Sequence, residues 1–125
     1  MKQHEKWLLK AENDLKAAKI LINNDNSVLD AAVYHCHQTA EKALKAYLVY
    51  KKREIIKTHD LRVLLMECSK EDKDFETLFD ISIELTPYST EFRYPGINLF
   101  PDIEDVEVSV KYAEQILVFV HKKIL

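Results

Sequence analysis

Glycine is almost missing from this chain, whose 125 residues include one glycine and three prolines. Glycine usually makes up about 7% of a protein. It supplies the tight turns of β-sandwiches and the phosphate-binding loops of Rossmann and P-loop proteins. A chain with a single glycine is therefore not expected to adopt these folds, and long helices with few connections remain.

The sequence also lacks segments that would target it to a membrane. It has no uncharged apolar run of about 18 residues, so no transmembrane helix is expected. The first residues carry Glu5 and several lysines where a signal peptide has an apolar core. Cys36 and Cys68 match no metal-ligand spacing and are expected to be reduced, with a buried disulfide as the alternative. Together these features predict a cytoplasmic protein that makes no membrane contact.

Charge is divided unevenly between the two halves of the chain. The net charge is −3, but residues 1–62 hold 12 Lys/Arg against 8 Asp/Glu, and residues 63–125 hold 6 against 13. The basic half would attract an anionic ligand, or would pair head to tail with the acidic half of a second chain. The commoner explanation is that both halves simply present solvated faces.

Apolar residues recur at helical spacing through most of the chain, and no strand pattern is present. The pattern predicts helices at about 3–23 and 29–51, a third after Thr58, a fourth at about 72–85, and a fifth ending near residue 125. Residues 93–103 are expected to form the one long loop, because Pro95-Gly96 favours a turn. The sequence thus predicts a single all-α domain over 1–125, an up-and-down bundle of about five helices with one long loop before the last.

The second predicted helix carries a coherent polar stripe opposite its apolar face. The stripe consists of His35, Gln38, Glu41, Lys42 and Lys45. Small alanines on the same helix allow neighbouring backbones to approach closely. This helix is therefore expected to lie at the centre of the fold, and a dimer interface is one location that fits it. The stripe would then face a cleft or a second subunit. The alternative is that the stripe is the solvent face of an amphipathic helix.

Basic residues gather at the end of this helix and in the connection that follows. They are Lys42, Lys45, Lys51, Lys52, Arg53, Lys57 and Arg62. Such a cluster is typical of an anion or phosphate site, and Tyr47 and Tyr50 would be placed to stack a base. Lysines near the C-terminus of a helix also complement the helix macrodipole without binding any ligand.

The histidines give no strong indication of a metal or catalytic site. His35 and His37 point in different directions on a helix, so they cannot chelate one metal, and His37 is expected to be a packed core residue. No metal or cofactor site is predicted. Arg53 and His59 are spaced as a pair that could stabilise a phosphorane-like charge and move a proton, as ribonucleases require. The alternative for His59 is a structural role at the start of a helix.

Arg93 opens the long loop beside Tyr94 and Pro95. An arginine held on a proline-containing loop can bind a phosphate or carboxylate bidentately. It can equally form an ion pair with a neighbouring helix and fix the loop.

Four segments, taken in order, carry a resemblance to a known family. They are Trp7-x-x-x-Ala11-x-x-Asp14-Leu15, HCHQTAEKALKA at 35–46, Thr58-His59-Asp60-Leu61 with Leu64, and Arg93-Tyr94-Pro95. Together they resemble the HEPN domain (higher eukaryotes and prokaryotes nucleotide-binding) over nearly the whole chain. The resemblance implies a bundle of about five helices that assembles as a homodimer.

Many small proteins of this kind are encoded beside a minimal nucleotidyltransferase. Their fold is similar to the helical C-terminal domain of kanamycin nucleotidyltransferase, which helps to bind substrate and nucleotide. The resemblance therefore implies that the polar stripe, together with Arg93 and Tyr94, lines a ligand-binding or partner-binding face. Catalysis would then belong to the partner.

Another branch of the family consists of metal-independent ribonucleases, often toxins or antiviral effectors. They carry an arginine followed, four to six residues later, by a histidine near the start of a late helix. No histidine follows Arg93 at that distance, and the Arg53–His59 pair lies before the third predicted helix.

These observations favour a dimeric, non-catalytic protein that binds a nucleotide or similar anion and acts with a nucleotidyltransferase. The alternative is a ribonuclease that uses Arg53 and His59, or Arg93 with a histidine from elsewhere, and RNA is a partner only in that case. A third possibility is an antitoxin-type scaffold that merely covers a partner's surface.

Overall fold

The structure is a computed structural model that describes residues 1–23 and 27–125. Five α-helices form within the described residues, joined by two 3-10 segments. They are α1 (Gln3–Ile22), α2 (Leu29–Tyr50), α3 (Leu61–Glu71), η1 (Lys73–Leu78), α4 (Phe79–Leu85), η2 (Thr86–Ser89) and α5 (Ile103–Ile124). The predicted all-α bundle, with its long loop before the last helix, is confirmed.

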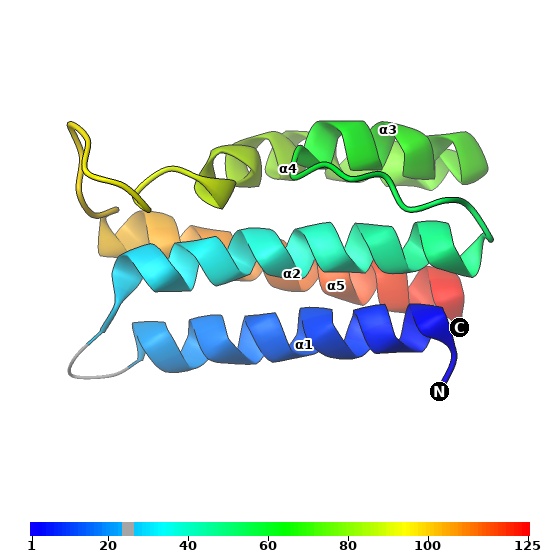
Figure 1. Ribbon diagram of the computed structural model, residues 1–125, viewed down its shortest axis with the longest axis horizontal. Helices are drawn as coiled ribbons and strands as arrows, with labels where there is room; N and C mark the ends of the chain where they lie inside the picture. The colour runs from blue at the N-terminus through cyan, green and yellow to red at the C-terminus, as the bar shows by residue number, and fades with distance from the viewer. Residues whose placement is uncertain (24–26) are drawn as a thin grey trace.

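Helix α2 lies at the centre of the bundle (Figure 1). Helices α1 and α5 pack along it on one side and the α3–α4 layer covers the other. Close approach is possible because Ala32, Ala40, Ala43 and Ala46 of α2 are fully buried. A central position for this helix, expected from its alanines, is thus confirmed.

Aromatic side chains close the core between α2 and the other elements. Tyr47 of α2 packs on Phe75, with ring centroids 4.4 Å apart. Phe75 in turn meets Phe119 of α5 edge to face at 4.9 Å. Such pairs stabilise a core beyond the apolar area that they bury. Tyr47 is therefore a core residue and is closed to a stacking base, contrary to the sequence-based expectation.

The fourth predicted helix is shorter than the pattern indicated. Residues 73–78 form a 3-10 segment, and the α-helix begins only at Phe79. Asp72 starts the segment, because its backbone is extended and its carboxylate accepts a hydrogen bond from the Asp74 amide. Phe75 and Leu78 are buried three residues apart, which is the period of a 3-10 helix.

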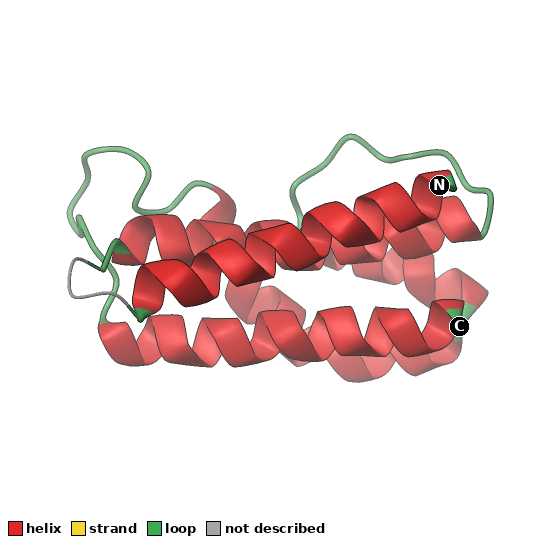
Figure 2. Cartoon of the chain, turned by 90° about the horizontal axis from the view of Figure 1, so that it is seen from below, coloured by secondary structure: helices red, strands yellow, loops and turns green. Residues whose placement is uncertain are grey.

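The connection from α2 to α3 doubles back along α2 (Figures 1 and 2). The Arg53 amide donates to the Leu48 carbonyl at 2.9 Å, which turns the chain after the helix. This return brings His59 to the middle of α2. The segment 51–60 therefore places residues that are distant in sequence beside the polar stripe.

Both chain ends lie at one end of the bundle, and the loop before α5 lies at the other (Figure 1). Met1, Lys2, Ile124 and Leu125 line a common hollow of about 480 Å³. Among the described residues, no helix is long and apolar enough to cross a membrane.

Candidate functional site

The polar stripe of α2 is largely covered rather than open to water. Gln38, Glu41 and Lys45 are buried, whereas His35 and Lys42 are partly exposed. Helix α1 and the returning segment 51–60 supply the groups that meet these side chains. The alternative of a solvated face is therefore wrong for the three buried residues.

Glu41 connects the central part of the stripe to the returning segment. Its Oε2 accepts a hydrogen bond from Lys45 Nζ at 3.0 Å, and both side chains are buried. Its Oε1 lies 2.7 Å from Nδ1 of His59. Charged groups are rarely buried unless paired in this way. Glu41 therefore balances the charge of Lys45 and holds His59 in place.

His37 is fully buried beside this carboxylate, as expected for a packed core histidine. Its Nε2 lies 2.7 Å from the carbonyl oxygen of His59, which can only accept. The proton therefore sits on Nε2, and Nδ1 has no hydrogen-bond partner in the described part of the chain. Burial lowers the pKa of His37 below its usual value, so the ring is neutral near pH 7.

Asp14 of α1 connects the other part of the stripe. Its Oδ1 lies 2.8 Å from Nδ1 of His35, and its Oδ2 accepts from Lys42 Nζ at 2.6 Å. The carboxylate is buried, whereas His35 and Lys42 remain partly exposed. Because Nδ1 of His35 is committed to Asp14, Nε2 is the nitrogen left to meet a ligand.

Arg93 lies next to this group, at the start of the long loop. Its guanidinium carbon is 4.4 Å from the centre of the Tyr34 ring, so the two planes form a cation–π contact. Tyr34 also meets the His35 ring edge to face, with centroids 5.7 Å apart. Arg93 is exposed and forms no ion pair with a carboxylate in residues 1–23 or 27–125. The ion-pair alternative for Arg93 therefore does not apply.

The structure does not bring Arg53 and His59 to a common site. Arg53 donates to the Glu67 carbonyl and carboxylate at 2.9 and 3.1 Å, and lies 3.6 Å from the Glu71 carboxylate. His59 instead contacts Glu41. Each side chain thus has its own acidic partner on a different helix.

The basic cluster is mostly neutralised by neighbouring carboxylates. Lys42, Lys45, Arg53 and Arg62 each form an ion pair. Lys51 lies over the rings of Tyr47 and Tyr50, at 5.8 and 5.7 Å from their centres. The cluster is therefore less positive than its lysine and arginine content indicated.

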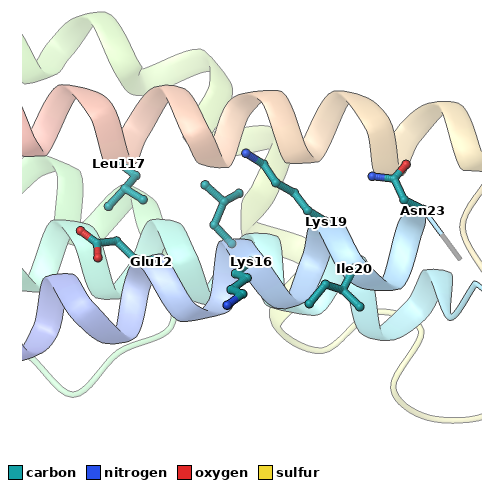
Figure 3. Close-up of a pocket in the computed structure, with 7 residues that line it drawn as sticks. Glu12, Lys16, Lys19, Ile20, Asn23 and Leu117 are labelled. Atoms are coloured by element: carbon teal, nitrogen blue, oxygen red, sulfur yellow. The ribbon is translucent and has the colours of Figure 1, made fainter.

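A large hollow lies elsewhere, in the groove between α1 and α5 (Figure 3). It measures about 780 Å³, with Glu12, Lys16, Lys19 and Ile20 of α1 on one side and Leu117 of α5 on the other. Two ion pairs cross from α1 to α5 beside it, Lys19–Glu114 at 2.8 Å and Glu12–His121 at 2.7 Å. None of the residues selected from the sequence as ligand-binding lines this groove.

No group of three metal-ligating side chains occurs in the described ranges. The candidate site is instead the surface of Tyr34, His35 and Arg93, supported by Asp14 and Lys42. We call it the Arg93 site. Tyr94 lies at its edge and is 69% exposed.

Sequence reasoning assigned no role to Asp14 or Tyr34. Asp14 could have been selected from the sequence, because its spacing places it on the same helix face as the buried Ala11, Leu15 and Ala18. A carboxylate on a buried face needs a cationic partner. Tyr34 gives none, because only the folded loop places Arg93 on its ring.

Comparisons with known proteins agree with this fold. A family model described as HEPN domain matches residues 4–124. TT1696 from Thermus thermophilus has a similar structure, with a TM-score of 0.85 and 22% identity over 98% of this chain and 99% of that one. ST0689, an archaeal HEPN homologue, gives a TM-score of 0.79 and 25% identity over 100% of both chains. No curated protein matched significantly.

Proposed function

Because the chain belongs to the HEPN domain family, we propose that it is a non-catalytic protein that binds a nucleotide or a similar phosphate-bearing ligand at the Arg93 site. In this proposal it acts with a small nucleotidyltransferase, as a homodimer. The observation that carries the proposal is the exposed Arg93 guanidinium, which is oriented by the Tyr34 ring and is not paired with a carboxylate in the described chain.

The chemistry of Arg93 suits a phosphate. A guanidinium presents a planar fork of donors that matches two phosphate oxygens. The contact with Tyr34 restrains the guanidinium, and among the described residues its N–H groups donate no hydrogen bond. Less conformational entropy is then lost when the ligand binds.

Neighbouring groups extend the same site. Asp14 orients the ring of His35, so its Nε2 can contact a second ligand oxygen. Lys42 neutralises Asp14 at 2.6 Å and so reduces the repulsion between that carboxylate and a phosphate. Tyr94 is exposed at the edge and can stack on a base.

The buried members of the stripe have a different role in this proposal. Gln38, Glu41 and Lys45 are covered by neighbouring elements and are not placed to touch a ligand. Glu41 instead holds α2 to the segment 51–60 through His59, and Lys45 balances the charge of Glu41 within α2.

Thermal unfolding with added ATP, other nucleotides and aminoglycosides tests the proposal. Ligand at about 100 times its dissociation constant adds about 2.7 kcal/mol, which raises the midpoint by several degrees. We expect a shift that is lost in Arg93→Ala and reduced in Arg93→Lys, because lysine lacks the planar fork. Arg62→Ala is the matched control, since Arg62 is exposed but paired with Asp60.

A shift that survives in Arg93→Ala would place the ligand elsewhere, and the α1–α5 groove would then be the next site to examine. The absence of a shift with every ligand would contradict binding by the isolated chain. Sedimentation of the purified protein tests the homodimer, and association with a purified nucleotidyltransferase tests the partner.

One observation favours a second candidate function, a metal-independent ribonuclease. Asp14 holds Nδ1 of His35 at 2.8 Å, beside an arginine able to stabilise a pentacovalent phosphate. This corresponds to the ribonuclease alternative in which Arg93 acts with a histidine from another part of the chain, here His35. It predicts RNA cleavage in EDTA that is lost in His35→Ala and retained in His59→Ala.

A further inference from the structure

Phe92 has a backbone conformation that large side chains rarely adopt. Its φ angle is 69°, in the left-handed region. A bulky residue stays in this region only when its surroundings hold it there. Lys52, the other such residue within the described ranges, directly follows the end of α2, where a left-handed residue commonly ends a helix. Phe92 does not directly follow an α-helix, so its conformation needs another explanation.

The aromatic ring of Phe92 attaches the start of the long loop to the bundle. It stacks on the ring of Tyr88, with centroids 6.2 Å apart and planes 26° from parallel. It also packs against a small buried cluster that joins α2 to α5 and consists of Ala32, Val33 and Val106. The residues on either side of Phe92 in the loop are exposed. The ring of Phe92 is therefore the contact that holds this part of the loop.

Two consecutive residues of the loop meet two consecutive residues of α2. Phe92 packs against the cluster that contains Val33, and the guanidinium carbon of Arg93 lies 4.4 Å from the centre of the Tyr34 ring. The backbone between them is also fixed, because the Arg93 amide donates to the Thr90 carbonyl at 3.2 Å. The left-handed φ of Phe92 thus turns the chain so that both side chains reach α2.

Of these two contacts, the one made by Phe92 is the stronger restraint on the loop. Arg93 is exposed, and a cation–π contact at an exposed site is weak. The contacts of Phe92 remove apolar surface from water, which stabilises them in proportion to the area covered. An arginine without this restraint would spend only part of its time over Tyr34, and ligand affinity falls in proportion to that fraction.

We propose that Phe92 is a positioning residue, whose attached ring and left-handed backbone set Arg93 over Tyr34 in the orientation that binds a phosphate. The placing of the guanidinium follows from the contacts of Phe92 alone. The effect on ligand binding rests on the proposed function.

NMR of the arginine side chains tests the positioning without any ligand. The chain has three arginines, so its spectrum contains three Nε–H signals to assign. Protons above an aromatic ring are shifted upfield, and among the described residues only Arg93 of the three lies over a ring. We expect the upfield shift of Arg93 to be lost in Phe92→Ala. It should be kept in Phe92→Tyr, which retains a ring to stack on Tyr88.

Val106→Ala is the matched control, because Val106 is fully buried in the same cluster. It leaves a cavity and lowers stability, but the Arg93 signal should keep its upfield shift. An unchanged Arg93 signal in Phe92→Ala, or an equal change in Val106→Ala, would overturn the proposal. Phe92→Gly removes both the ring and the backbone strain. It should show the same loss and replaces Phe92→Ala if that variant does not fold.

Calorimetric titration with ATP separates this inference from the proposed function. Phe92→Ala should bind ATP about tenfold more weakly, as expected if Arg93 is correctly placed in about a tenth of the molecules. Phe92→Tyr and Val106→Ala should bind like the wild type. If the Arg93 signal depends on Phe92 but the wild type does not bind ATP, the positioning is supported and the proposed function is contradicted. ATP binding that requires Arg93 but is unchanged in Phe92→Ala would overturn the positioning role alone.

Discussion

Glu41 is a buried carboxylate whose two oxygens contact different partners. One oxygen neutralises Lys45 inside the bundle, and the other meets an imidazole whose side chain is 72% exposed. Taking a charge out of water is costly unless an opposite charge accompanies it. The contribution of each partner to stability therefore depends on whether the other is present.

Glu41→Leu should lower the free energy of unfolding by about 3–5 kcal/mol, because it leaves the Lys45 ammonium buried without a counter-charge. The double variant Glu41→Leu/Lys45→Met should recover most of that loss, since it removes both charges and keeps the volume. Urea unfolding of the wild type and the single and double variants measures both effects. A double variant as unstable as Glu41→Leu would show that the ion pair is not the cause.

His37 should make stability depend on pH in a defined direction. Burial lowers its pKa in the folded protein below the ordinary 6.5, so the unfolded chain binds the proton more tightly. The free energy of unfolding should be greatest above about pH 6.5 and should fall as the pH drops from there toward the folded-state pKa. The slope contributed by one proton is at most about 1.4 kcal/mol per pH unit.

Urea unfolding between pH 5 and 8 measures this slope in the wild type and in His37→Gln. The variant retains a side-chain donor for the His59 carbonyl, but it cannot take up a proton. Its slope should therefore be shallower, and an unchanged slope would assign the pH dependence to other groups.

At the scale of whole elements, the longest helices were predicted well because one face of each is continuously apolar. The alanines of α2 carried enough information to place that helix at the centre. The region from 72 to 89 was predicted less well, because Phe75, Leu78 and Phe79 are spaced to fit both a 3-10 and an α-helix. The Asp72 cap and Pro87 decide between them, and the result is three short segments.

The candidate site depends on contacts that no helical pattern encodes. The stripe on α2 was found, but its partners come from α1 and from the segment 51–60. Whether Gln38 meets a ligand or a neighbouring element is decided by how those segments pack. Arg53 and His59 show the same limit, since their spacing is compatible with a pair and their tertiary contacts separate them.

The close packing of α2 predicts a penalty for added volume. Ala43 is fully buried, so Ala43→Leu should force neighbouring helices apart and lower stability by about 1–3 kcal/mol. Ala17→Leu on α1 is the control, because Ala17 is only half-buried. Thermal unfolding compares the two, and an equal midpoint for Ala43→Leu and the wild type would mean that this face can expand freely.

At the scale of the whole molecule, stability should be graded from the central helix to the loop end. Helix α2 is buried along most of its length, whereas Phe92 alone of residues 91–100 is partly covered. Amide protons within α2 should exchange only on global unfolding, and those of the loop should exchange almost freely. Hydrogen exchange read by mass spectrometry measures this gradient. Rapid exchange in the middle of α2 would contradict its central role.

The placement of Met1 and Leu125 around one hollow, away from the long loop, has a practical consequence for engineering. Neighbouring termini at the surface allow a chain to be circularly permuted, with a short linker joining the old ends and new ends opened in an exposed loop. Opening the chain between Gly96 and Ile97 would cut the loop before α5 and keep every described helix whole. Such a permuted protein should fold and retain the Arg93–Tyr34 contact. Ligand binding by it would show that the Arg93 site does not depend on an unbroken loop.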